Sequence, residues 1–413
     1  MTDDLMKSSG SGDAGNSTHA DEQRLYPKVR FRGFDEPWKN KKFLTFSSKI
    51  TKNSTSDDID FPRIEFENIV SGEGKLAQNR SKLNHIKSGI KFDKGDILFG
   101  KLRPYLKNWW LAEFPGVAVG DFWVIRAKDN RYFLYYLIQA PLFEKVSNYT
   151  TGTKMPRSDW NYVSNTFFKL PKIDEQEKIG RILDKVDSLL SLQQRKLELE
   201  NKLKKQIAFY LYSFTLTPNF KHIEVKNKKL GDIVDISNGI MGDSQKKSGN
   251  FKLTRIETIS NGKIDLSRTG YIDQVSDEKK FLEVGDILYS NINSLTHIGK
   301  NAIVKEKHLP LVHGINLFRL HITNNQITPN YLHGLLNLPK YKWWVKSHAN
   351  PAVNQASINK TELSSLVIKY PDLDIQNQIN NINYSFAQYW DIQYSKKESL
   401  CQLKQFLLQN LFI

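Results

Sequence analysis

Two polar segments that directly follow short apolar runs carry side chains suited to contacts with nucleic acid. In the first, KLRPYLK at residues 101–107, these side chains alternate with mostly apolar ones: Lys101, Arg103, Tyr105 and Lys107. Arginine can donate two hydrogen bonds to guanine O6 and N7, whereas lysine more often contacts phosphate. We therefore expect Arg103 to read a base. The alternative is that Arg103 pairs with a carboxylate and that Tyr105 packs in the core.

The second segment, YSNINSLTHIGK at residues 289–300, follows an equivalent apolar run but has different chemistry. Its candidate contact residues carry amide, hydroxyl and ammonium groups: Asn291, Asn293, Ser294 and Lys300. Asparagine can bind adenine through two hydrogen bonds, and the others suit the sugar-phosphate backbone. Two different loops predict two different DNA half-sites.

Two further loops precede the last strand expected in each half of the chain. TTGTKMPRSDW at residues 150–160 contains Lys154 and Arg157, and HANPAVNQAS at residues 348–357 contains Asn354 and Gln355. Glutamine and asparagine can read adenine, but the same side chains also stabilise turns. Both interpretations of these four residues stay open.

The segments that position these loops occur twice in the chain, in the same order. The repeated motifs are KNKK at 39–42 and 226–229, RIE at 63–65 and 255–257, GDIL at 95–98 and 285–288, and PxxDxQxxI at 171–179 and 371–379. A separation of about 190 residues indicates a duplicated domain, whereas solenoid repeats have periods of roughly 20–50 residues. Short apolar runs bounded by Gly, Asp, Asn and Pro predict that each copy is a mixed α/β domain.

A long amphipathic helix is expected at the end of each copy. Asp174 and Glu177 form a capping-box pattern, and residues 181–217 contain neither Gly nor Pro. About 39 residues would span roughly 58 Å at 1.5 Å per residue. Apolar side chains at spacings of three and four predict the helix interface: Ile179, Ile182, Val186 and Leu203 in the first helix, and Ile379, Ile382, Phe386 and Leu403 in the second.

Connectivity predicts that the two helices run antiparallel, because the first leads from copy one to copy two and the second must return. The expected fold is α+β, with two similar mixed α/β domains separated by an antiparallel coiled coil and related by a pseudo-twofold axis. The predicted boundaries are a disordered tail at 1–24, domains at 25–174 and 218–374, and spacer helices at 175–217 and 375–413. The alternative is that the helices dimerise the chain with itself or with a partner.

Composition favours a polyanionic partner. The chain has 60 Lys and Arg against 44 Asp and Glu, a net charge of +16, which suits nucleic acid first and an anionic membrane surface second. No run approaches the roughly 18–20 apolar residues of a membrane span, and residues 1–24 lack a signal-peptide core, so we expect a soluble cytoplasmic protein. Cys401 is the single cysteine, and without the usual ligand patterns we expect no metal site.

Catalytic motifs are absent from the sequence. There is no NPPY or DPPY tetrapeptide, no convincing GxGxxG segment and no GxxxxGK[ST] phosphate loop. DEKK at residues 277–280 resembles part of a nuclease motif but has no partner carboxylate before it, so we interpret it as a solvated turn. We therefore expect no enzymatic activity and no cofactor in this chain.

Residues 168–214 resemble the conserved helix that ends each target-recognition domain in DNA specificity subunits of type I restriction-modification systems. The opening YPKVRFRGFDEPW, with Trp38, Lys41 and Lys42 nearby, resembles the start of such subunits. The second copy departs from the pattern where DEQEKI becomes DIQNQI.

The resemblance implies a non-catalytic subunit that binds a split, asymmetric duplex sequence and docks two methyltransferase (modification) subunits. Those subunits would carry S-adenosylmethionine and methylate adenine, and restriction subunits would add an ATP- and Mg-dependent nuclease. The alternative from another class is an autonomous DNA-binding scaffold or repressor-like protein.

Overall fold

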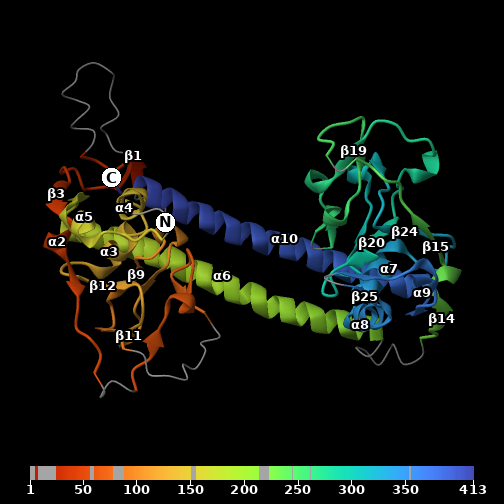
Figure 1. Cartoon of the computed structure of the whole chain (residues 1–413), viewed down its shortest axis with the longest axis horizontal. Helices are drawn as coiled ribbons and strands as arrows, with labels where there is room; N and C mark the ends of the chain where they lie inside the picture. The colour runs from red at the N-terminus through yellow and green to blue at the C-terminus, as the bar shows by residue number, and fades with distance from the viewer. Residues whose placement is uncertain are drawn as a thin grey trace. The chain divides into compact units, whose positions relative to one another are not determined.

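The structure is a computed structural model that describes residues 5–7, 25–55, 60–77, 88–149, 155–213, 223–243, 245–260, 262–352 and 355–413. The chain forms two compact units, which Figure 1 shows coloured along the sequence: unit 1 contains Met1–Lys196 and Tyr394–Ile413, and unit 2 contains Leu197–Gln393. Each long helix is thus divided between the units. None of the described helices is both long enough and apolar enough to cross a membrane.

Unit 1 is a mixed α/β domain built on a four-stranded sheet of order β10-β9-β12-β4 and a three-stranded sheet of order β5-β11-β8. Its strands are β1 (Leu5–Lys7), β2 (Val29–Phe31), β3 (Lys39–Lys42), β4 (Ser47–Ile50), β5 (Arg63–Ile64), β6 (Ile69–Val70), β7 (Lys75–Leu76), β8 (Ile90–Phe92), β9 (Ile97–Gly100), β10 (Trp109–Leu111), β11 (Gly116–Ala118), β12 (Phe122–Ala127) and β13 (Phe167–Leu170). Its short helices are α2 (Phe43–Phe46), α3 (Arg131–Leu137), α4 (Pro141–Ser147) and α5 (Trp160–Asn165).

Strand β1 lies within the segment for which the sequence predicts a disordered tail. It pairs antiparallel with β2, with Met6 opposite Arg30. The remainder of residues 1–24 lies outside the described residues.

Unit 2 repeats the plan, with a four-stranded sheet of order β15-β24-β20-β22. Its strands are β14 (Lys226–Lys229), β15 (Val234–Asn238), β16 (Phe251–Leu253), β17 (Ile259–Ser260), β18 (Lys263–Ile264), β19 (Gly270–Ile272), β20 (Ile287–Tyr289), β21 (Ile292–Asn293), β22 (Asn301–Ile303), β23 (Leu311–Val312), β24 (Phe318–Ile322), β25 (Asn350–Ala352), β26 (Gln355–Ser357) and β27 (Val367–Tyr370). Its helices are α7 (Pro329–Leu336), α8 (Pro339–His348) and α9 (Lys360–Ser364).

The duplicated motifs occupy equivalent places, which explains why they are shared. Asp96 and Asp286 are buried before strands β9 and β20, and each accepts a backbone hydrogen bond of 2.7 Å from the residue three positions earlier. The intervening Gly95 and Gly285 have φ of 93° and 96°, a conformation that favours glycine. The KNKK strands β3 and β14 each pair antiparallel with the strand that leads into a long helix. The prediction of two similar mixed α/β domains is confirmed.

The two long helices are α6 (Ile173–Ser213, 41 residues) and α10 (Leu373–Asn410, 38 residues). In unit 1, Leu183 near the start of α6 shares a core with Leu407 near the end of α10. In unit 2, Leu211 near the end of α6 shares a core with Ile379 near the start of α10. Each unit therefore shows antiparallel packing, as predicted from connectivity.

The buried seam of these helices differs in phase from the predicted one. Ile179, Val186 and Ile379 are buried, and Ile182 and Phe386 are partly buried. Three other predicted interface residues are exposed and lie outside the buried seam: Leu203 (51%), Ile382 (39%) and Leu403 (36%).

The physical reason is the heptad spacing of the seam. Buried or partly buried side chains recur at alternating spacings of three and four at positions 183, 186, 190, 193, 197 and 200, and again at 207 and 211. Lys204 falls in the same register but is exposed. The same series holds 200 residues later in α10. Leu203, Ile382 and Leu403 each precede a seam position by one residue, so they point to the side of the seam.

Candidate nucleic-acid interface

The structure brings the two candidate loops of unit 1 side by side. The backbone N–H of Arg103 donates to the carbonyl of Pro156 at 2.8 Å, and the N–H of Ser158 donates to the carbonyl of Lys101 at 2.9 Å. Residues 101–107 and the described part of 150–160 therefore form one surface, as the separate predictions of two reading loops require.

A single carboxylate, Asp121, forms ion pairs with two of the predicted contact residues. Its side chain lies 3.6 Å from the Lys101 ammonium and 3.1 Å from the Arg157 guanidinium. Sequence reasoning did not identify Asp121, because it lies 14 residues after the end of the 101–107 loop and approaches it only through the sheet. These pairs hold Lys101 and Arg157 in place and leave them less charge to offer a partner.

Arg103 differs from its neighbours. It is exposed, and among the described residues none forms a side-chain hydrogen bond or ion pair with it. Its φ of 49° is in the left-handed region, as is that of Lys107 at 56°, and between them Pro104–Leu106 form a single 3-10 turn. The backbone is thus tightly turned, and it presents Arg103 and the 54% exposed Tyr105 outward. Neither side chain adopts the carboxylate-paired or core-packed alternative.

Lys107 forms an ion pair with Glu144 of helix α4 at 2.8 Å. This contact fixes the far end of the loop against the domain. Lys107 is therefore better placed to stabilise the loop than to meet a base.

Unit 2 also brings its two candidate loops together, here through a small sheet of order β21-β26-β25. Asn293 lies opposite Ala356, and Asn350 lies opposite Ser357. Within each unit, therefore, the two candidate loops are neighbours. They are joined by different contacts in unit 1 and unit 2.

Several polar side chains of the unit 2 loop already have internal partners. Asn293 donates to Ser290 Oγ at 3.1 Å and accepts from the backbone N–H of Ser294 at 2.9 Å, and Ser294 Oγ lies 2.9 Å from His297 Nδ1. Asn291 is 8% exposed, and its Oδ1 has no hydrogen-bond partner among the described residues.

Lys300 is half-buried and Gln355 is exposed, so both remain available to a ligand. Lys154 and Asn354 lie outside the described residues. The role of every predicted contact residue in DNA binding remains a prediction.

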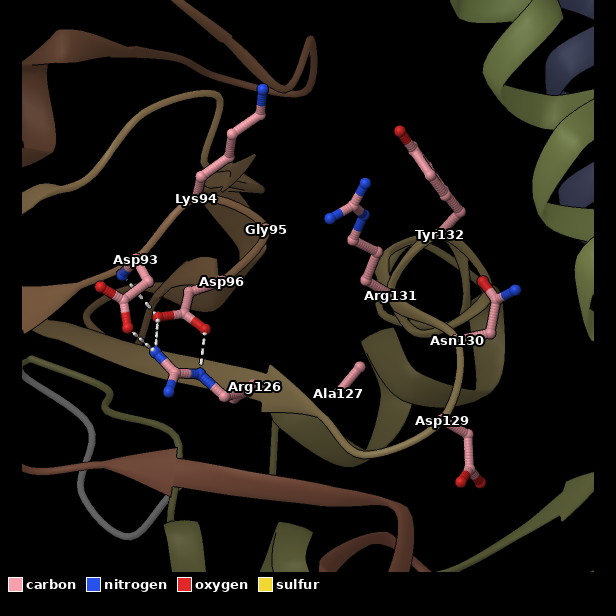
Figure 2. A pocket seen from close by; sticks show the side chains of 10 residues that line it. All are labelled: Asp93, Lys94, Gly95, Asp96, Arg126, Ala127, Asp129, Asn130, Arg131 and Tyr132. Atoms are coloured by element: carbon pink, nitrogen blue, oxygen red, sulfur yellow. Dashed lines mark hydrogen bonds and ion pairs between the residues drawn. The ribbon is translucent and has the colours of Figure 1, made fainter.

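A cavity of about 580 Å³ lies elsewhere on unit 1, between the turn before β9 and the start of α3 (Figure 2). Arg126 forms ion pairs of 2.5 Å with Asp93 and 2.7 Å with Asp96, and the hydrogen bonds that it donates to Asp96 raise the pKa of Arg126 above its usual value. Arg131 lies on the opposite wall, with its guanidinium 5.1 Å from the Tyr132 ring centre. The guanidinium of Arg126 is thus held by two carboxylates and is occupied within the domain.

The family of the chain follows from comparison with known proteins. The model of the type I restriction modification DNA specificity domain matches residues 38–204 and 222–400, one match for each copy of the repeat. The chain therefore belongs to the family of type I restriction-modification specificity subunits, which are themselves non-catalytic.

Similar proteins include two from Methanocaldococcus jannaschii. The chain is 39% identical over 213 residues to a protein described as the specificity subunit of the type I restriction enzyme MjaX, an alignment that covers 49% of this chain and 50% of that protein. It is 24% identical over 302 residues to the MjaVIII specificity subunit, covering 68% and 69%. The chain thus spans about half the length of the MjaX relative.

Solved structures share the fold. The S subunit of a type I restriction-modification system from M. genitalium matches with a TM-score of 0.58 at 16% identity, covering 94% of this chain and 99% of that one. A chain from a structure of type I system assembly and conformational transition matches with a TM-score of 0.56 at 21% identity, covering 90% and 96%. At sequence identities of 16% and 21%, these matches show a shared fold alone.

Proposed function

We propose that this chain is the DNA-recognition subunit of a type I restriction-modification enzyme and binds a bipartite, asymmetric duplex sequence, one half-site per unit. The observation that carries this proposal is that one domain occurs twice with different side chains in equivalent loops. Arg103 is exposed in unit 1, whereas unit 2 offers amides and Lys300. One scaffold with two reading surfaces is suited to an asymmetric target.

The helices supply a surface on which two modification subunits can dock. Beside the buried seam, each unit exposes apolar side chains that all lie one residue before a seam position. In unit 1 these are Leu189, Leu192, Leu403 and Phe406; in unit 2 they are Leu199, Leu203, Tyr210, Ile382, Tyr389 and Ile392. Exposed apolar side chains that gather on one face are typical of protein interfaces. One such face per unit matches two modification subunits per chain.

Catalysis and cofactors belong to the partners in this proposal. S-adenosylmethionine would be bound by the modification subunits, and ATP and Mg by the restriction subunits, in the cytoplasm where the host DNA lies. This chain would contribute recognition and assembly.

The test is to express the chain with a modification subunit encoded beside it and to sequence the host methylome with and without this gene. We expect co-purification and adenine methylation at one split sequence that disappears when the gene is removed. Tight sequence-specific binding by the isolated chain, with no methylation and no partner, would instead support an autonomous repressor-like protein.

Arg103→Ala should relax base preference in one half-site only. Loss of two hydrogen bonds to guanine would reduce discrimination by about 1–3 kcal/mol, or roughly 5- to 150-fold. Competition binding with duplexes substituted in either half-site measures this effect. Arg32→Ala is the control, because it removes an exposed arginine of the same unit outside the 101–107 loop and should leave base preference unchanged. An equal loss of preference in both half-sites would contradict the assignment.

Leu192→Glu should weaken docking of a modification subunit without unfolding the chain. Leu192 is 65% exposed, so the free energy of unfolding should change by less than about 0.5 kcal/mol. A charge in the centre of an apolar interface should reduce affinity by about 10- to 100-fold. Ser191→Glu, which places the same charge on another side of α6 at a partly exposed position, is the matched control. Equal binding by both variants, measured by calorimetry, would rule out this face.

A further inference from the structure

Helix α8 of unit 2 is strongly basic. Its ten residues, PKYKWWVKSH, contain three lysines and a histidine but no acidic residue. Lys342 and Lys346 are four residues apart and therefore lie on the same side of the helix. Trp343, beside Lys342, is 67% exposed. The basic run of α8 is evident from the sequence, but a basic run alone is more often a solvated face.

The packing of α8 adds further ammonium groups to this surface. The helix packs against the end of the 289–300 loop, since a Cβ built on Gly299 would lie 3.4 Å from Val345 Cγ1. Lys300 follows this contact. Burial and the positive charges of Lys346, Lys300 and Lys205 of α6 lower the pKa of Lys342. We call Lys205, Lys300, Lys342 and Lys346 the lysine cluster.

In unit 1 the position equivalent to Lys342 carries an acidic residue that is paired with a lysine. Helices α4 and α8 both begin with proline, and the third residue of each, Phe143 or Tyr341, is buried. The next residue is Glu144 in unit 1, where it pairs with Lys107 at 2.8 Å. In unit 2 the next residue is Lys342. The same position therefore carries an ion pair in one copy and repelling charges in the other.

Nothing in the described part of the chain neutralises the cluster, because no described carboxylate forms an ion pair with any of its four lysines. Half-buried like charges destabilise a fold unless an anion binds between them. We propose that the lysine cluster binds phosphates of the DNA backbone beside the half-site read by unit 2. This inference rests on the proposed function, because it assumes that duplex DNA lies against the 289–300 loop.

DNA fits the cluster better than an acidic protein does. Lys300 ends the loop that carries the candidate base contacts of unit 2, so a duplex on that loop would run past α8. Phosphates recur along each strand and can meet several ammonium groups at once. Unit 2 would then make more contacts with the DNA backbone than unit 1, because Lys101, Lys107 and Arg157 of unit 1 are paired internally.

The experiment measures the salt dependence of duplex binding by the full chain. Each phosphate contact contributes about 0.9 to the slope of log affinity against log salt. We expect Lys342→Gln with Lys346→Gln to reduce the slope by about 2, and to weaken target and unrelated duplexes by the same factor. Lys342→Glu, which recreates the pair of unit 1 with Lys300, should reduce binding further than Lys342→Gln.

Controls separate the possible outcomes. Lys307→Gln removes one exposed charge from the same unit outside the cluster and should leave the slope unchanged. Lys342→Gln removes repulsion, so its melting temperature should be equal to or above that of the parent, which checks folding independently.

An unchanged slope in the double variant, with specific binding by the parent, would overturn the inference and leave the proposed function intact. Loss of the modification subunit with unchanged DNA binding would assign the cluster to an acidic protein surface and overturn it as well. Absence of any duplex binding and methylation by the parent complex would refute both.

Discussion

Glu175→Gln is expected to lower the free energy of unfolding of unit 1 by about 3–5 kcal/mol, the cost of removing one partner from a buried ion pair. Glu175, at the start of α6, accepts two hydrogen bonds of 2.8 Å from Arg30 of β2. The two side chains are only 7% and 1% exposed. Glutamine preserves the shape of the site but leaves a guanidinium charge that is buried without a counter-charge.

Urea unfolding, followed by tryptophan fluorescence, measures this change. Glu177→Gln is the matched control: it makes the same substitution two residues later in an exposed pair with Arg181 and should cost less than about 1 kcal/mol. Replacing both Arg30 and Glu175 by apolar residues should recover much of the loss. Equal effects of the two glutamine variants would show that burial does not govern this pair.

The Arg30–Glu175 pair illustrates what sequence can and cannot predict. The helix start follows from local patterns, since Gln176 and Gln376 repeat and both donate to the carbonyl of the proline five residues earlier. The ion pair joins residues 145 positions apart. Its counterpart in unit 2 is absent because Ile375 occupies the equivalent place, so the duplication gave no signal for it.

The exposure of Leu203, Ile382 and Leu403, which the sequence pattern did not indicate, has a related cause. Leu203, Ile382 and Leu403 are as hydrophobic as true seam residues, and spacings of four fit a straight helix nearly as well as alternating spacings of three and four. The buried face and the exposed face of each helix differ only in heptad phase, and packing against the partner helix sets that phase. Lys204 and Lys404 occupy seam positions that hydrophobicity alone would reject.

The order of the candidate loops along the chain could be predicted, but their ion pairs could not. Their place after the GDIL strands follows from the repeat, whereas the pairing of Lys101 and Arg157 with Asp121 depends on sheet packing. The exchange of Glu144 in unit 1 for Lys342 in unit 2 also depends on the structure. It is recognised only when helices α4 and α8 are matched through their buried residues Phe143 and Tyr341.

Acidification is expected to destabilise unit 2 before carboxylates titrate. His313 is 1% exposed and lies 2.8 Å, through Nε2, from the carbonyl of Leu317; His333 Nδ1 lies 2.7 Å from Asn301 Oδ1. Burial lowers the pKa of each to about 4 from 6.5. Both rings are therefore neutral in the folded state, while the unfolded chain binds protons as pH falls below 6.5.

The sign of the linkage follows from these depressed values. The stabilising contribution is fully present above pH 6.5 and is lost progressively as pH falls towards 4. Between pH 7 and 5 we expect a loss of about 2 kcal/mol for each histidine, because the unfolded state takes up the proton that the folded state rejects. Urea unfolding of the intact chain at several pH values measures the slope.

His313→Gln with His333→Gln should make the free energy of unfolding of unit 2 nearly independent of pH in this range, although the variant will be less stable at pH 7. His297→Gln, which changes an exposed histidine of the same unit, is the control and should retain the parent slope. A parent protein whose stability is constant from pH 7 to 5 would show that these rings are not held neutral by burial. A loss of stability in the double variant as steep as in the parent would place the titrating groups elsewhere, with His308 the next to examine because burial also lowers its pKa.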